Sequence, residues 1–157
     1  MGIRLINKGS IMSEENYGTK APKWFIGVAI IALIWNLLGV LAYISQMMMT
    51  PEVLAQLSAE EQALYKNTPM WATIGFTFAV WAGTIGSILL LLKKKSAKIV
   101  LIISFIGVLV QVSHSFFFSN SFEVYGPGAM AMPIMIIIIG ILLIWLSDKG
   151  MKKGWLS

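Results

Sequence analysis

Four long apolar runs without any Asp, Glu, Lys or Arg dominate the hydrophobic pattern of this chain, and short polar segments separate them. The runs cover residues 24–49, 70–92, 99–118 and 130–147. At about 1.5 Å rise per residue, helices of about 18 to 26 residues can cross a hydrocarbon core of about 30 Å. The pattern therefore predicts an all-α membrane protein, an antiparallel bundle of four transmembrane helices.

The segment between the first two runs carries a helical pattern of its own. Thr50-Pro51-Glu52 is typical of a helix start, with an N-cap, a proline at the first helical position and an acid in the first turn. From there to Tyr65, the apolar residues fall roughly on one face. We expect a short amphipathic helix in the first external loop, resting on the membrane boundary or on the mouth of the bundle, as a plain linker or as a gating lid.

Composition places the chain outside the soluble globular class and charge orients it. The chain is 57% hydrophobic and 12% charged, with a mean hydropathy of +0.79. Every basic residue except Lys66 lies before the first run, between the second and third runs, or after the fourth. The positive-inside rule predicts that both termini are cytoplasmic. We interpret the basic clusters as orientation signals and contacts with anionic lipid, and not as a nucleic-acid site.

The remaining segments are short. We predict a disordered cytoplasmic tail over residues 1–22, a four-helix transmembrane domain over 23–149 and a short basic cytoplasmic tail over 150–157. The N-terminal residues lack the apolar region of a cleavable signal peptide. Met12 is an alternative start to Met1, because the residues between them show no periodicity.

Small residues recur at intervals of four in the second run, at Gly75, Ala79, Gly83 and Ser87. This spacing places them on one helix face and lets another helix approach closely. The stripe predicts a helix–helix contact, with either another span of this chain or a second protomer.

Few polar side chains fall at membrane depth, and four of them are candidates for a solute path. They are Asn36 in the first run, and Ser104, Gln111 and His114 along one face of the third. His114 is either a proton relay or solute ligand, or a neutral residue satisfied by a neighbouring amide, hydroxyl or water. Asn36 either holds helices in register or binds a substrate.

The same scarcity argues against catalysis and metal chemistry. The chain has no cysteine and one histidine, and no acidic residue lies within the four runs. These residues cannot assemble a nucleophile–base–acid set or a metal site within the membrane, and no phosphate-binding or dinucleotide fingerprint is present. We therefore predict a protein that is not an enzyme and that has no cofactor and no metal.

Several short strings are shared with one group of proteins. They are Trp35-Asn36-Leu37 with Gly39-Val40, Ala63-Leu64-Tyr65 followed by Pro69 and Trp71, Asn120 with Glu123-Val124-Tyr125-Gly126, Met132-Pro133, and Lys153-Gly154-Trp155. From about Lys23 to its end the chain resembles a family of small bacterial four-span membrane proteins, sometimes loosely labelled sugar transporters. The resemblance implies a transport role in a bacterial inner membrane. It carries no binding motif, so it assigns no site residue.

Two hypotheses of function follow from the sequence. The first is a small-solute transport component, with sugars as a candidate substrate, that acts as a homo-oligomer through the polar faces of the first and third spans. The second is a non-enzymatic accessory subunit that docks on a larger membrane complex through the small-residue stripe. In both, the lipid bilayer is the immediate partner.

Overall fold

A computed structural model describes residues 20–157, and within them every regular element is helical. The elements are α1 (Lys23–Met47), α2 (Pro51–Leu54), α3 (Ala59–Lys66), α4 (Met70–Leu91), α5 (Ala97–Phe117), α6 (Ser121–Tyr125), the 3₁₀ helix η1 (Pro127–Met130) and α7 (Ala131–Lys152). Four of them, α1, α4, α5 and the segment ending in α7, are long and apolar enough to cross a membrane. This confirms the prediction of a multi-pass, all-helical membrane protein. The predicted tail over residues 1–22, and the choice between Met1 and Met12, lie almost entirely outside the described residues.

The last long helix extends well beyond the apolar run that predicted it. That run ends at Ser147, whereas α7 continues through Asp148 and Lys149 to Lys152. The Asp148 carboxylate forms two ion pairs, from Oδ1 to Lys98 Nζ at 2.6 Å and from Oδ2 to Lys152 Nζ at 2.7 Å. Lys149, Met151 and Lys152 have good helix propensity, and the Asp148–Lys152 ion pair spans one helical turn, so the helix continues past the apolar stretch.

The segment after α1 forms two short helices, whereas the sequence pattern predicted one. Thr50 caps α2 as expected, accepting a hydrogen bond from the Val53 N–H at 3.4 Å, with Pro51 at the first helical position. Ser58 then starts α3 with a capping box, in which Ser58 Oγ and the Glu61 carboxylate each bind the other residue's backbone N–H. An N-cap residue has a non-helical backbone, so the single predicted helix is interrupted at Ser58.

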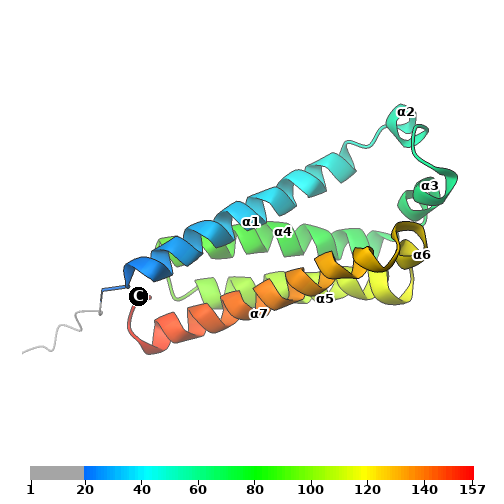
Figure 1. The fold of residues 1–157 in the computed structure, drawn as a ribbon. Coiled ribbons are helices and arrows are strands. Elements are labelled where there is room, and N and C mark those ends of the chain that lie inside the picture. The colour runs from blue at the N-terminus through cyan, green and yellow to red at the C-terminus, as the bar shows by residue number, and fades with distance from the viewer. Residues whose placement is uncertain (1–19) are drawn as a thin grey trace, which may run out of the picture.

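The four long helices lie side by side, and their contacts run in the order α1, α4, α5, α7 (Figure 1). The α4–α5 contact is the most extensive of the three. The two helices approach closely at Gly107, which has no side chain. A Cβ atom added there would lie 2.6 Å from the Ala79 backbone nitrogen and 2.7 Å from the Gly75 carbonyl oxygen. The helix pair α4–α5 therefore forms the centre of the structure, with α1 and α7 on its flanks.

The small-residue stripe of α4 faces the inside of this chain. Ser87 is fully buried, Ala79 is 7% exposed, and a Cβ on Gly83 would collide with the Asn36 carboxamide oxygen of α1. A Cβ on Gly75 would lie 2.7 Å from Val110 Cγ1 of α5. Of the two partners that the sequence left open, the structure selects neighbouring spans of the same chain.

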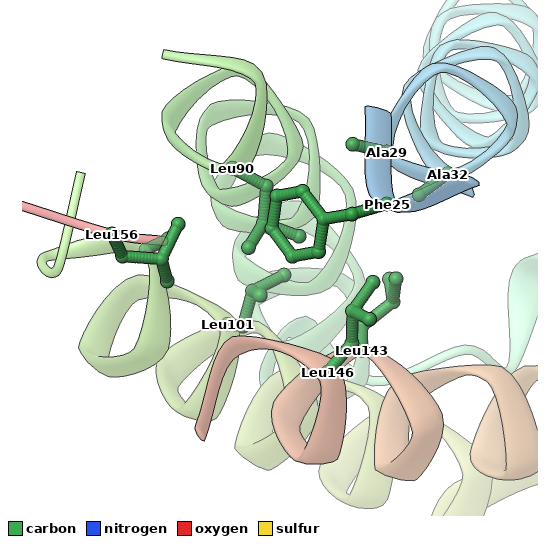
Figure 2. Close-up of a cluster of buried hydrophobic side chains, with 9 residues drawn as sticks. Phe25, Ala29, Ala32, Leu90, Leu101, Leu143, Leu146 and Leu156 are labelled. Atoms are coloured by element: carbon green, nitrogen blue, oxygen red, sulfur yellow. The ribbon is translucent and has the colours of Figure 1, made fainter. Parts of the chain in front are cut away.

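One end of the molecule, where the chain ends, is closed by an apolar cluster; we call it the C-terminal end, and the opposite end the α3 end. All four long helices and the last residues contribute side chains to this cluster, and Figure 2 shows Phe25 and Leu156 converging on Leu90 and Leu101. Phe25 and Leu90 are fully buried, and Leu156 is 1% exposed.

A tight turn after α7 brings Leu156 into the cluster. Gly154 has a φ of +70°, which favours glycine, and the Trp155 N–H then donates to the Gly150 carbonyl at 2.8 Å. The Ser157 N–H donates to the Lys93 carbonyl at 2.7 Å, which ties the end of the chain to the α4–α5 turn. The final residues thus form part of the closure instead of a free tail.

Candidate functional site

A polar cluster joins three helices near the middle of the bundle. Asn36 Nδ2 donates to the Ala32 carbonyl at 2.8 Å and to Ser87 Oγ at 3.1 Å, which links α1 to α4. On α5, Ser104 Oγ donates to the Ala79 carbonyl of α4 at 2.6 Å. Gly83 lies between the two, because a Cβ at that position would be 3.0 Å from Ser104 Oγ and would also meet Asn36. The sequence singled out Asn36, Gly83, Ser87 and Ser104 separately, and the structure brings them together.

A cavity of about 290 Å³ lies beside this cluster, between the two flanking helices and the central pair; we call it the central cavity. Asn36, Ser104 and Gln111 supply its polar lining. The rest of its lining is apolar and comes from α1, α4, α5 and α7, as follows: Trp35, Leu38, Gly39, Ala42, Phe76, Ala79, Val80, Gly83, Leu101, Phe105, Val108, Met132, Ile136, Ile139, Gly140 and Leu143. The volume approaches that of small-molecule sites, which begin at about 300 Å³.

A second cavity, of about 180 Å³, lies next to the central cavity toward the α3 end; we call it the neck cavity. It shares Phe76 and Gln111 with the central cavity. Gln46, Thr73 and Ser115 are among its other polar lining residues. The side chain of Gln111 makes no hydrogen bond with any residue of 20–157, so its amide is free to bind a molecule in either cavity.

A third cavity, of about 340 Å³, opens at the α3 end; we call it the mouth cavity. It shares Leu64, His114 and Ser119 with the neck cavity. Glu60 and Asn67 line it from the first loop, and Asn120 and Glu123 line it from the second. Two carboxylates and no Lys or Arg lie on its wall, so its electrostatic potential favours cations.

His114 lies where the neck and mouth cavities meet. The residue is 8% exposed, and its ring packs edge-on against Trp71 with the ring centroids 5.4 Å apart. Within residues 20–157 the imidazole has no hydrogen-bond partner, and no fully buried side-chain nitrogen or oxygen is left unsatisfied. Its ring nitrogens are therefore open to the cavities. Of the partners that the sequence allowed for a satisfied histidine, neither Gln111 nor a serine bonds the ring within the described residues, and water stays an alternative.

The two loops at the α3 end meet beside these cavities. The pKa of the Tyr125 hydroxyl is raised, mainly by partial burial and to a lesser extent by the negative charge of the nearby Glu61 carboxylate. Hydrogen bonds from Ser58 lower the pKa of Glu61. Tyr125 comes from α6 and Glu61 from α3, so the first and second loops form one surface over the mouth.

Of the predicted path residues, Asn36, Ser104 and Gln111 share the central cavity, and His114 lies apart from it, one cavity away. No sequence pattern marked the polar residues of the mouth as site residues, among them Glu60, Asn67 and Glu123. They fall in loops, where no periodic pattern marks which side chains face inward. Across residues 20–157, no three His, Cys, Asp or Glu side chains are placed to hold a metal ion.

Comparison of this chain with protein-family models, with curated proteins and with solved structures finds no match.

Proposed function

We propose that this chain is a small-solute transport component of a bacterial inner membrane that acts as a homo-oligomer. One observation supports this most directly: three adjacent cavities with shared lining residues run from the α3 end to the middle of the bundle. The path then stops at the buried cluster around Phe25 and Leu156. A path that is open at one end and closed at the other is what an alternating-access carrier adopts in one of its states.

The orientation belongs to the same proposal. The four spans form an antiparallel bundle with the C-terminal end in the cytoplasm, and α3 rests at the external mouth. In support, Lys149 Nζ lies 4.7 Å from the centre of the Trp145 ring and 5.6 Å from that of Trp24. Aromatic and basic residues collect in this way where helices leave a membrane. Opening toward the cytoplasm would require α1 and the last residues of the chain to separate.

The order of helix packing supports an oligomer. Because contacts run from α1 through α4 and α5 to α7, the flanking helices are joined only through the central pair over most of their length. A second copy could cover the side on which α1 and α7 leave the central cavity. Four helices are few to enclose a solute path alone, which also favours assembly.

Solute flux into proteoliposomes tests this function. Sugars are the first substrates to try, because of the resemblance noted in the sequence. If the cavities form the path, Gln111→Leu and His114→Leu abolish flux, whereas Ser113→Ala, on the same helix but outside all three cavities, retains it. Absence of flux from the wild-type protein across sugars, polyols, amines and amino acids would refute the proposal.

Labelling of single cysteines tests the orientation, since the chain contains no cysteine. A membrane-impermeant maleimide should modify Lys66→Cys in intact cells and Lys94→Cys only after permeabilisation. The reverse pattern would invert the topology and place the closed end outside.

The accessory-subunit hypothesis loses the docking surface on which it was based. The stripe from Gly75 to Ser87 is buried against α1 and α5 of the same chain. A subunit of this kind would have to bind through another face. Native mass spectrometry distinguishes the two roles, because the proposed transporter gives homo-oligomers alone.

A further inference from the structure

The hydrogen-bonding groups of the central cavity are mostly occupied by the protein itself. Both contacts of Asn36 Nδ2 are internal, to Ala32 and Ser87, and the Ser104 hydroxyl donates to Ala79. The groups left for a ligand are the Asn36 carbonyl oxygen, the Gln111 amide and the Trp35 indole N–H. A sugar carries several hydroxyls, and those without a partner would lose their bonds to water on entering. The central cavity is therefore suited to an apolar body and not to a polyol.

The free polar groups are found nearer the α3 end. His114 is more than nine-tenths buried, lines both the neck and the mouth cavities, and has no hydrogen-bond partner within residues 20–157. A neutral imidazole offers one acceptor nitrogen and one N–H donor. Such a group, buried and unpaired at a cavity wall, can accept a hydrogen bond from a ligand N–H.

The charge of the mouth selects among ligands of this kind. Glu60 and Glu123 line the mouth cavity from different loops, and no Lys or Arg lines any of the three cavities. Among the described residues, Lys66 is the basic residue of the α3 end, and its exposed side chain is not part of the mouth lining. The mouth of the path therefore favours cations over anions.

We propose that the substrate is an amphiphilic ammonium compound. Its ammonium N–H donates to His114 where the mouth and neck cavities meet, under the negative potential of Glu60 and Glu123, and its apolar body extends through the neck cavity toward the central cavity. This substrate class deepens the transport function proposed above and rests on it. Binding, however, can be measured without transport.

Equilibrium binding to the purified chain in a non-ionic detergent tests the proposal, with 2-phenylethylamine as the probe. The neutral isostere 2-phenylethanol and glucose are the comparison ligands. We expect the amine to bind about tenfold or more tightly than the alcohol, and glucose to show no binding. Equal affinity for amine and alcohol, or tighter binding of glucose, would overturn the proposal.

Variants separate the charge contribution from a general loss of structure. The double variant Glu60→Gln with Glu123→Gln changes two exposed residues and should weaken amine binding about tenfold. Glu52→Gln, another acid of the first loop but outside the cavities, should leave the affinity unchanged. His114→Gln should weaken the amine more than the alcohol. An unchanged amine affinity in the double variant would refute the role of the mouth.

Two further measurements distinguish the possible failures. If added phosphatidylethanolamine displaces the amine, a lipid headgroup with the same ammonium chemistry is the occupant, and the soluble substrate is refuted. If the amine binds but does not cross proteoliposomes, the site remains and the transport function fails. If glucose is transported and the amine does not bind, transport remains and this substrate class fails.

Discussion

Gly107 is the point at which the packing of the central helix pair can be tested most directly. A Cβ at this position would lie 2.6 Å from the Ala79 nitrogen, 2.7 Å from the Gly75 oxygen and 3.1 Å from Phe78 Cβ. The first two are backbone atoms of α4, which cannot rotate away as a side chain can. Gly107→Ala must therefore push α4 and α5 apart along their most extensive contact.

The size of the effect follows from two opposing contributions. Overpacking a close contact costs about 1–3 kcal/mol, and the upper part of that range applies because the obstructing atoms are backbone. Replacing glycine by alanine inside a helix stabilises the folded state by about 1 kcal/mol. The net loss is therefore about 2 kcal/mol. Gly27 in α1 is the matched control, because a Cβ there meets no atom within 4 Å, so that Gly27→Ala has only the favourable contribution.

Unfolding in mixed detergent micelles by added dodecyl sulfate, followed by tryptophan fluorescence, measures this difference. We expect Gly107→Ala to unfold at lower dodecyl sulfate than the wild type, and Gly27→Ala at the same concentration or higher. The gap between the two variants should approach about 3 kcal/mol. Equal midpoints for the two variants would show that α4 and α5 do not pack as closely as the structure has them.

Four further outcomes follow from particular contacts. Gly83→Ala should destabilise less than Gly107→Ala, because the atom it meets first belongs to the Asn36 side chain, which can rotate. Leu156→Ala should lower the unfolding free energy by about 2–3 kcal/mol through the cavity it leaves, whereas Leu92→Ala, at a site 61% exposed, should change it little in the same titration. Asp148→Asn removes the ion pairs to Lys98 and Lys152 and should lower the unfolding free energy slightly at low salt, a difference that should vanish at high salt because salt screens exposed ion pairs. Because Ser58 lowers the pKa of Glu61 below its ordinary value of 4.5, the capping box should stabilise α3 fully above that value and be lost as pH falls through the lowered pKa. Hydrogen exchange of α3 amides should show this loss, and Ser58→Ala should remove it.

The membrane-spanning helices could be predicted from the sequence because one physical signal, a long uncharged apolar run, determines them almost alone. The predicted ends of the helices were less accurate than their positions. Asp148 and Lys149 mark where hydrocarbon gives way to water, but a helix can continue through water, as α7 does. The break between α2 and α3 was readable in principle, since Ser58 followed by Glu61 is the sequence signature of a capping box.

The site was only partly within reach of sequence reasoning. Rarity alone singled out Asn36, Gln111 and His114, because each polar side chain in a long apolar run is conspicuous. Their partners could not be found in this way. The bond from Asn36 to Ser87 joins residues on different helices, and their rotation about the helix axes is set by packing that no local pattern encodes. The acids of the mouth cavity lie in loops, where only the tertiary structure decides which side chains face inward.

Close packing on one side of the central pair also explains why a cavity exists on the other. Gly75, Gly83 and Gly107 draw α4, α5 and the middle of α1 together, so the remaining helix, α7, packs on α5 at a distance from α1. The two flanking helices share the buried cluster at the C-terminal end. The second buried cluster, around Ala79, Val108 and Val112, includes α7 residues but, among those described, none of α1. Because both flanking helices contribute to the cluster at the C-terminal end, α1 and α7 close that end together. The mouth cavity at the opposite end is lined instead by α3, the end of α5 and α6. In the proposed carrier, opening toward the cytoplasm would separate α1 and α7 at this cluster while the close α4–α5 contact stays intact, and closing the mouth would move α3 and α6.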